Sequence, residues 1–277
     1  MTFSTFLTFF AALPVFLDCP ATCAEQRVET QLTELAAAVR SADYRGDREA
    51  LARLDAQLAK LPDSSLDDYR AYWRAFACWR RALNGFNENP TPNDLVVDVE
   101  AAIGHFKEAL AKHPNWIEAK LGLVGCSGNL IYLVGKDPEK RKAILDEYVP
   151  IGRTLQIDAP DNPRVLWIVG GLQLAAPPPT GGDPARAAVT MRKGIECAWR
   201  ESLAGGRAPW EPAWGGAENL MNLAWLYSNS AMADKAAARA YAQGALTVEP
   251  DWHYVKDVLL PKIEAMPEPA SAPSASK

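Results

Sequence analysis

The stretch AAIGHFKEALAKHP, residues 101–114, decides the fold class. Within it, small, aromatic and aliphatic residues follow one another at steps of four, three, one and four residues: Ala102, Phe106, Ala109, Leu110 and Pro114. Such steps keep side chains on one face of a helix, where small residues let a second helix approach and larger ones fill the gap. Proline stops a helix interior but is tolerated in the first turn of the next helix, so Pro114 marks a joint between two helices.

The same steps occur near both ends of the chain. Toward the amino end the members are Ala50, Leu54, Gln57, Leu58 and Pro62, and toward the carboxyl end they are Ala238, Ala242, Ala245, Leu246 and Pro250. A further helix of this kind begins at Asp183-Pro184, where Asp183 suits the N-cap and Pro184 the first helical position. The chain therefore contains an internal helical repeat.

Helical signals run almost without interruption from Glu25 to about Met266, and no alternating Val/Ile/Thr segment indicates a strand. We expect an all-α fold of five antiparallel helix pairs and a carboxyl-terminal capping helix. The expected helices span 26–41, 47–60, 65–85, 94–112, 115–134, 138–157, 163–175, 184–203, 216–230, 234–248 and 252–265. Pro150 should kink or split one of them. Such a stack should be quasi-linear, each pair burying its apolar face only against its neighbours.

The repeated steps resemble the second helix of a tetratricopeptide repeat, with its small, aromatic, small and proline positions. The first helix is represented by Leu220, Leu223, Ala224 and Tyr227, which match that family's large, large, small and aromatic positions. The stretch DNPRVLWIVGGLQLAAPPPTGGDPARA (161–187) is similar to a group of bacterial tetratricopeptide-like proteins, many of them exported, that carry a Pro-Pro…Gly-Gly-Asp linker. This resemblance covers roughly residues 100–265. It implies a tetratricopeptide-like α-α superhelix and says little about function.

The two ends of the chain differ from the repeat. The apolar run FLTFFAALPVFL (6–17) matches a signal-peptide core and is far shorter than the roughly 20 residues that span a bilayer. We expect residues 1–24 to be a signal peptide cleaved after Ala24, although no Lys or Arg precedes the run; a buried amino-terminal helix is the alternative. Residues 25–266 then form the helical domain, and the Pro/Ala/Ser-rich segment 267–277 should be disordered. The mature protein would be periplasmic or secreted, without a membrane span.

Composition excludes some partners and cofactors. With 29 basic and 34 acidic residues the net charge is -5, which argues against nucleic-acid binding. Cys78, Cys126 and Cys197 have no CxxC spacing and are expected to be buried apolar side chains. None of the three histidines, His105, His113 and His253, is expected to have a second ligand at i+3 or i+4 suited to a metal, and solvated or capping roles are favoured for His105 and His113. No metal and no cofactor are expected.

Motifs for catalysis are weak. Ser127 in GLVGCSGN lacks the closing glycine of a nucleophile elbow, so helix packing explains those glycines better, and Gly135-Lys136 lacks the first glycine of a phosphate-binding loop. The chain is therefore not expected to be an enzyme.

In tetratricopeptide arrays the first helix of each pair lines the concave side, which selects candidate binding residues here. They are Glu118, Leu121, Gly125, Asn129, Arg164, Trp167, Asn222, Trp225 and Asn229. Asparagine amides can donate to and accept from a peptide backbone, and tryptophans supply flat apolar area. Trp167 and Trp225 could instead be core residues. The other tryptophans are assigned to helix packing, notably Trp73, Trp79, Trp116, Trp199 and Trp252.

Three functions stay open on this basis. The leading one is an exported scaffold that binds a peptide or protein partner through the concave groove. The second is a small-ligand module resembling tetratricopeptide components associated with bacterial TRAP-type transporters, where helices enclose a pocket. The weakest is an enzyme assembled from helix ends, using Ser127, His105 or Cys126.

Overall fold

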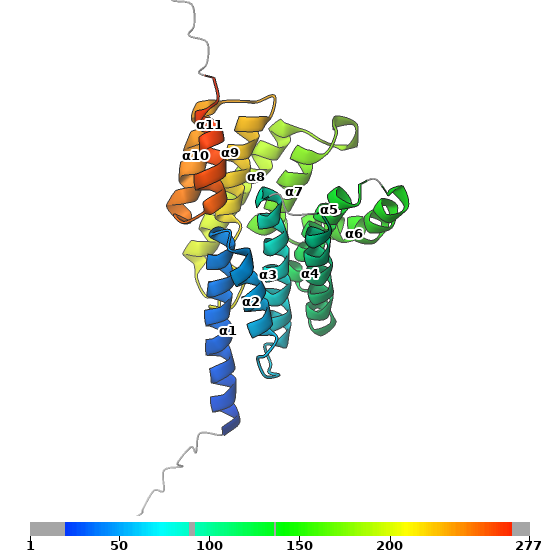
Figure 1. Ribbon diagram of the computed structural model, residues 1–277, viewed down its shortest axis with the longest axis vertical. Helices are drawn as coiled ribbons and strands as arrows, with labels where there is room; N and C mark the ends of the chain where they lie inside the picture. Colours follow the sequence, from blue (N-terminus) through cyan, green and yellow to red (C-terminus); the bar gives the residue numbers. More distant parts are fainter. Residues whose placement is uncertain (1–19, 89–91, 136, 268–277) are drawn as a thin grey trace, which may run out of the picture.

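A computed structural model describes residues 20–88, 92–135 and 137–267, and this part of the chain is all-helical, without strands (Figure 1). Eleven α-helices follow one another there, with a short 3₁₀ turn, Pro178–Thr180 (η1), and a π-helical stretch, Tyr254–Leu259 (η2), that leads into the last helix. The helices are α1 (Pro20–Tyr44), α2 (Arg48–Leu58), α3 (Asp67–Glu88), α4 (Pro92–Lys112), α5 (Ile117–Leu133), α6 (Pro138–Asp158), α7 (Pro163–Ala175), α8 (Pro184–Ala204), α9 (Gly216–Asn229), α10 (Lys235–Val248) and α11 (Leu260–Glu264).

The predicted helices are confirmed, and their ends agree within three residues except at the start of α1 and at the last helix, where the expected span 252–265 is divided between η2 and α11. The local reason is capping. Asp47, Asp137, Asn162, Asp183 and Asp234 each accept a hydrogen bond from a backbone N–H in the first turn of the helix that follows. Proline occupies the first turn of α6, α7 and α8, as expected at Pro184.

Pro150 does not split its helix, because α6 continues from Pro138 to Asp158. A proline in a helix interior removes the hydrogen bond to the carbonyl four residues earlier, here that of Asp146. Both residues are exposed, so water can reach the freed carbonyl. The expectation was a kink or a split at Pro150, and the split does not occur.

Consecutive helices pack in adjacent pairs, and the odd-numbered helices α1, α3, α5, α7 and α9 also contact one another in order, forming a continuous layer. The repeat residues lie at these seams. Ala102, Phe106 and Ala109 of α4 are fully buried, as are Ala238, Ala242 and Ala245 of α10. A Cβ on Gly122 of α5 would lie 2.2 Å from the Phe106 ring, so the absence of a side chain lets α4 and α5 meet.

The stack is not linear, because its first helix touches its last ones. Tyr44, at the end of α1, packs edge-on against Trp252 with ring centroids 5.1 Å apart and shares a cluster with residues of α9, α10 and η2. Its hydroxyl donates a hydrogen bond to Glu218 Oε1 of α9 at 2.9 Å. Figure 1 shows the upper end of α1 at the base of α9–α11. The expectation that each pair buries its face only against its neighbours is therefore corrected.

The connection between α8 and α9, residues 205–215, also packs into the molecule. Trp73 Nε1 of α3 donates to the Trp210 carbonyl at 2.7 Å, and Trp214 Nε1 donates to Tyr72 Oη at 3.0 Å. Trp214 is buried against the rings of Phe76 and Trp79. This segment, which we call the inner loop, covers part of the inward-facing surface of α3.

The described residues test the expected domain boundaries only in part. Residues 1–19 of the expected signal peptide and 268–277 of the expected tail lie outside the described residues. Pro20 to Ala24 form the start of α1, in one helix with Glu25. Among the helices that the structure describes, none combines the length and apolarity needed to cross a membrane.

Candidate ligand-binding cleft

Three of the residues expected to line an open groove lie in the interior instead: Glu118, Leu121 and Arg164. Arg164 Nε donates to both carboxylate oxygens of Glu118 at 2.8 Å, and its terminal nitrogens donate to Glu201 at 2.7 and 3.0 Å and to the Trp214 carbonyl at 2.9 Å. Leu121 is fully buried in the main core. Because the inner loop lies over this part of the helices, these side chains hold the fold together and are not open to a partner.

Asn229 lies apart from the other candidates. It is exposed at the carboxyl end of α9, where its Nδ2 donates to the Trp225 carbonyl at 3.1 Å and to Ser228 Oγ at 2.7 Å. Those hydrogen bonds cap the helix locally. Asn229 therefore does not join the site described next.

Of the five remaining candidates, four line one cleft and the fifth, Gly125, lies in a hollow beside it. Asn129 of α5, Trp167 of α7, and Asn222 and Trp225 of α9 line one cleft of about 540 Å³. An adjoining hollow of about 310 Å³ shares three of them and reaches Gly125 and Gly128 of α5. Cavities of 300 to 1,000 Å³ commonly hold small molecules. Side chains from α5, α7 and α9 thus meet in one cleft.

The polar side chains that line this cleft are Asn129, Asn222 and, at one edge, Asp43, Arg80 and Asn84. Trp79 Nε1 donates to Asn129 Oδ1 at 2.9 Å, which orients that amide and leaves its Nδ2 toward other acceptors. Trp167 Nε1 is buried without a hydrogen-bond partner among the described residues. An unpaired buried N–H is costly, so an acceptor that reached it would be favoured. The remaining lining is largely apolar: Leu83, Phe86, Gly171, Leu174, Ala175, Met221, Trp252 and Tyr254.

A buried arginine, which the sequence analysis missed, lies at the edge of this cleft. The Arg80 guanidinium carbon is 4.7 Å from the centroid of Phe76, 5.4 Å from Trp79, 5.5 Å from Trp167 and 4.8 Å from Trp214. Cations over ring faces are stabilised by the ring quadrupole. The sequence signal was the spacing of Phe76 and Arg80, four residues apart on one helix face within the aromatic-rich stretch YWRAFACWRR.

Carboxylates balance that charge. Arg80 lies 3.3 Å from Asp43 Oδ2 of α1 and 3.1 Å from Glu218 Oε1 of α9. Asn84 Nδ2 donates to Asp43 Oδ1 at 3.0 Å. Burial raises the pKa of Asp43 to about 6, against the opposing effect of Arg80. At this edge of the cleft a compensated ionic cluster therefore joins α1, α3 and α9 and does not present a bare charge.

The structure also shows where the cysteines, Ser127 and the tryptophans assigned to packing lie. Cys78, Cys126 and Cys197 are buried as expected, and Ser127 is buried with its hydroxyl donating to the Val124 carbonyl. Trp73, Trp79, Trp116 and Trp252 are buried at helix seams, whereas Trp199 is 66% exposed on α8. The packing assignment of Trp199 was wrong because its position on α8 faces away from both neighbouring helices. Gly125 serves packing, since a Cβ there would lie 2.3 Å from Trp79.

Comparison with known proteins gives no further indication of family or activity: no family model, no curated protein and no solved structure matches this chain.

Proposed function

We propose that this chain is an exported, non-enzymatic helical-repeat protein that binds a compact ligand in the cleft between α3, α5, α7 and α9. One observation carries the proposal: the inner loop covers part of the inward-facing surface of α3, and beside it lies a cleft of about 540 Å³ walled by aromatic and amide side chains. That volume suits a small molecule better than a long extended peptide.

The lining defines the class of ligand. Trp167 and Trp225 offer flat apolar area, while the Asn222 amide offers hydrogen bonds. Arg80 is already paired with two carboxylates, so its charge does not select an anion. A neutral or amphipathic small molecule with an apolar ring or chain and a hydrogen-bond acceptor fits best.

A short peptide segment is the second candidate, and two amides favour it. Asn129 and Asn222 lie in the same cleft and could pair with the backbone of a chain that places one side chain between the tryptophans. This candidate is the peptide-binding hypothesis limited to a peptide of the few residues that fit into the cleft.

The decisive experiment compares binding to the cleft with binding elsewhere. A panel of metabolite-sized compounds and short peptides is screened by thermal shift, with displacement of the dye 1-anilinonaphthalene-8-sulfonate as a second readout. Binders should lose at least tenfold in affinity in Asn222→Ala and in Trp225→Ala, because both side chains line the cleft. Trp199→Ala removes an exposed indole from α8 and should bind like the unchanged protein. Equal affinity for all three variants would reject the cleft as the site.

Two structural parts of the proposal have support of their own. A tetratricopeptide-like superhelix is supported by the fully buried alanines at the seams and by the continuous contacts of α1, α3, α5, α7 and α9. Export rests on the apolar run 6–17 and on the small residues before Glu25.

Export is tested by cell fractionation and amino-terminal sequencing. The chain recovered from the envelope fraction or the medium should begin at Glu25. Recovery of a chain that starts at Met1 from the cytoplasmic fraction alone would reject both the signal peptide and the location.

A further inference from the structure

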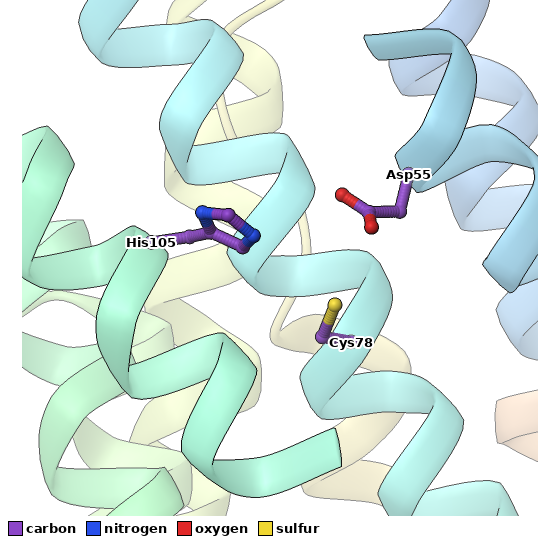
Figure 2. A group of neighbouring side chains, drawn as sticks. All are labelled: Asp55, Cys78 and His105. Carbon is purple, nitrogen blue, oxygen red and sulfur yellow. The ribbon is translucent and has the colours of Figure 1, made fainter. Parts of the chain in front are cut away.

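Three potential metal ligands converge where α2, α3 and α4 meet (Figure 2). Asp55 comes from α2, Cys78 from α3 and His105 from α4, and their ligand atoms all lie within 4.8 Å of one another. Figure 2 shows the Asp55 carboxylate, the Cys78 sulfur and a ring nitrogen of His105 pointing toward a common space. Residues from three successive helices thus form a cluster that no single-helix spacing would reveal.

The separations need only a small contraction to accommodate an ion. Ligand atoms about 2.0–2.3 Å from a tetrahedral zinc lie roughly 3.3–3.8 Å from one another. Cys78 is 6% exposed and fixed in the core. The side chains of Asp55 and His105 are 25% and 20% exposed, so rotation about their own bonds can close the remaining distance of about 1 Å without moving a helix.

Neighbouring groups orient two of the three ligands. His105 Nδ1 lies 3.3 Å from Glu108 Oε2, a distance suited to a ring N–H that donates to the carboxylate, which leaves Nε2 for the ion. Metal-binding histidines commonly donate their other ring N–H to a carboxylate in this way. Arg74 Nε donates to Asp55 Oδ1 at 2.8 Å, which leaves Oδ2. Spacing within α4 alone does not show the two ligands on α2 and α3, which is why no metal was expected at His105.

We propose that Asp55, Cys78 and His105 bind one divalent transition-metal ion, for which Zn²⁺ is the best match, with a water molecule in the fourth position. Thiolate and imidazole ligands favour zinc and similar ions over Mg²⁺ or Ca²⁺, which prefer oxygen. On binding, the metal–sulfur bond replaces the Cys78 S–H bond and the proton passes to solvent, without electron transfer. The ion would tie α2, α3 and α4 together. This site is independent of the ligand proposed for the cleft.

Cobalt provides a direct probe. The untagged chain is freed of metal with a chelator and titrated with Co²⁺, and the near-ultraviolet thiolate-to-cobalt band and the visible bands of a tetrahedral ion are followed. We expect one equivalent to bind and Zn²⁺ to displace it. Cys78→Ser should abolish the thiolate band, and Asp55→Asn should weaken binding at least tenfold. Cys197→Ser, which removes a buried thiol from α8, should give the full spectrum.

A second variant keeps the test valid if Cys78→Ser does not fold. His105 is partly exposed, so His105→Gln should fold, bind Co²⁺ at least tenfold more weakly and lose the rise in melting temperature that Zn²⁺ gives the unchanged chain. The proposal is overturned if the unchanged chain shows no thiolate-to-cobalt band. It is also overturned if His105→Gln and Cys197→Ser bind Co²⁺ equally well.

Discussion

At the residue scale, two glycines of α5 have opposite environments. A Cβ on Gly125 would lie 2.3 Å from Cζ2 of Trp79, whereas nothing lies within 4 Å of a Cβ on Gly128. The Trp79 ring is also held in place, because its Nε1 donates to Asn129 Oδ1 of α5. Gly125 is therefore needed for the approach of α3 and α5, and Gly128 is not.

Alanine at each position should separate these roles. Gly125→Ala should lower the free energy of unfolding by about 1–3 kcal/mol, because the added methyl displaces a buried indole. Gly128→Ala should raise it by up to about 1 kcal/mol, because alanine favours the helix. Urea unfolding of both variants measures the difference. Equal effects of the two substitutions would show that Gly125 does not set the spacing of α3 and α5.

Residue-level prediction from the sequence was correct where the cause is local. The seam alanines and the N-cap Asp183 follow from spacing along one helix, and the structure buries or caps them as expected. The residues expected to line the groove were predicted less well, because some of them are buried. Glu118 and Arg164 are on the inward side of their helices, yet they pair with each other beneath the inner loop. Nothing in the helix pattern indicates what covers a helix face.

At the scale of elements, the inner loop is what the helical repeat could not predict. Its stretch GGRAPWEPAWGG has no helical period, but two tryptophans between prolines and glycines are a sign of a buried connection. The loop is held by Arg164, whose guanidinium bonds the Trp214 carbonyl, Glu118 and Glu201 together. One side chain thus connects α7, α5, α8 and the loop.

Arg164→Gln tests that connection. The variant leaves the buried Glu118 without its cation and should lower the free energy of unfolding by about 3–5 kcal/mol. Lys193→Gln breaks an exposed pair with Asp161 and should cost about 1 kcal/mol or less. Chemical denaturation compares the two variants. A cost for Arg164→Gln as small as that of the surface variant would mean that the pair does not hold the loop.

At the scale of the whole molecule, contacts between the two ends of the chain turn the row of helices back on itself. Arg40 and Asp43 of α1 lie beside Glu249 and Glu218 of the last repeat, with Arg40 Nη2 3.8 Å from Glu249 Oε1. In the quasi-linear stack that the sequence suggested, the first and last helices would not touch. Long-range closure depends on the curvature summed over all the pairs, which no segment of sequence encodes by itself.

The closure should make stability depend on pH. Burial raises the pKa of Glu249 from 4.5 to about 7 against the opposing charge of Arg40, with Glu218 and Asp43 adding to the rise. Asp43 shifts in the same direction. Between about pH 4.5 and 7 the folded protein thus holds protons that the unfolded chain has released. These groups therefore destabilise the fold as the pH rises through that window, and the effect is complete above about pH 7.

Glu249→Gln removes the largest of these shifts. Relative to the unchanged protein, the variant should gain about 1–3 kcal/mol in the free energy of unfolding between pH 4.5 and 7.5, so the difference between the two should grow with pH. Urea unfolding at a series of pH values in this range measures it. Glu100→Gln, an exposed change on α4, should keep a constant difference from the unchanged protein. If the Glu249→Gln difference is also constant with pH, the carboxylate is not desolvated, and α1 does not close on the last repeat in solution.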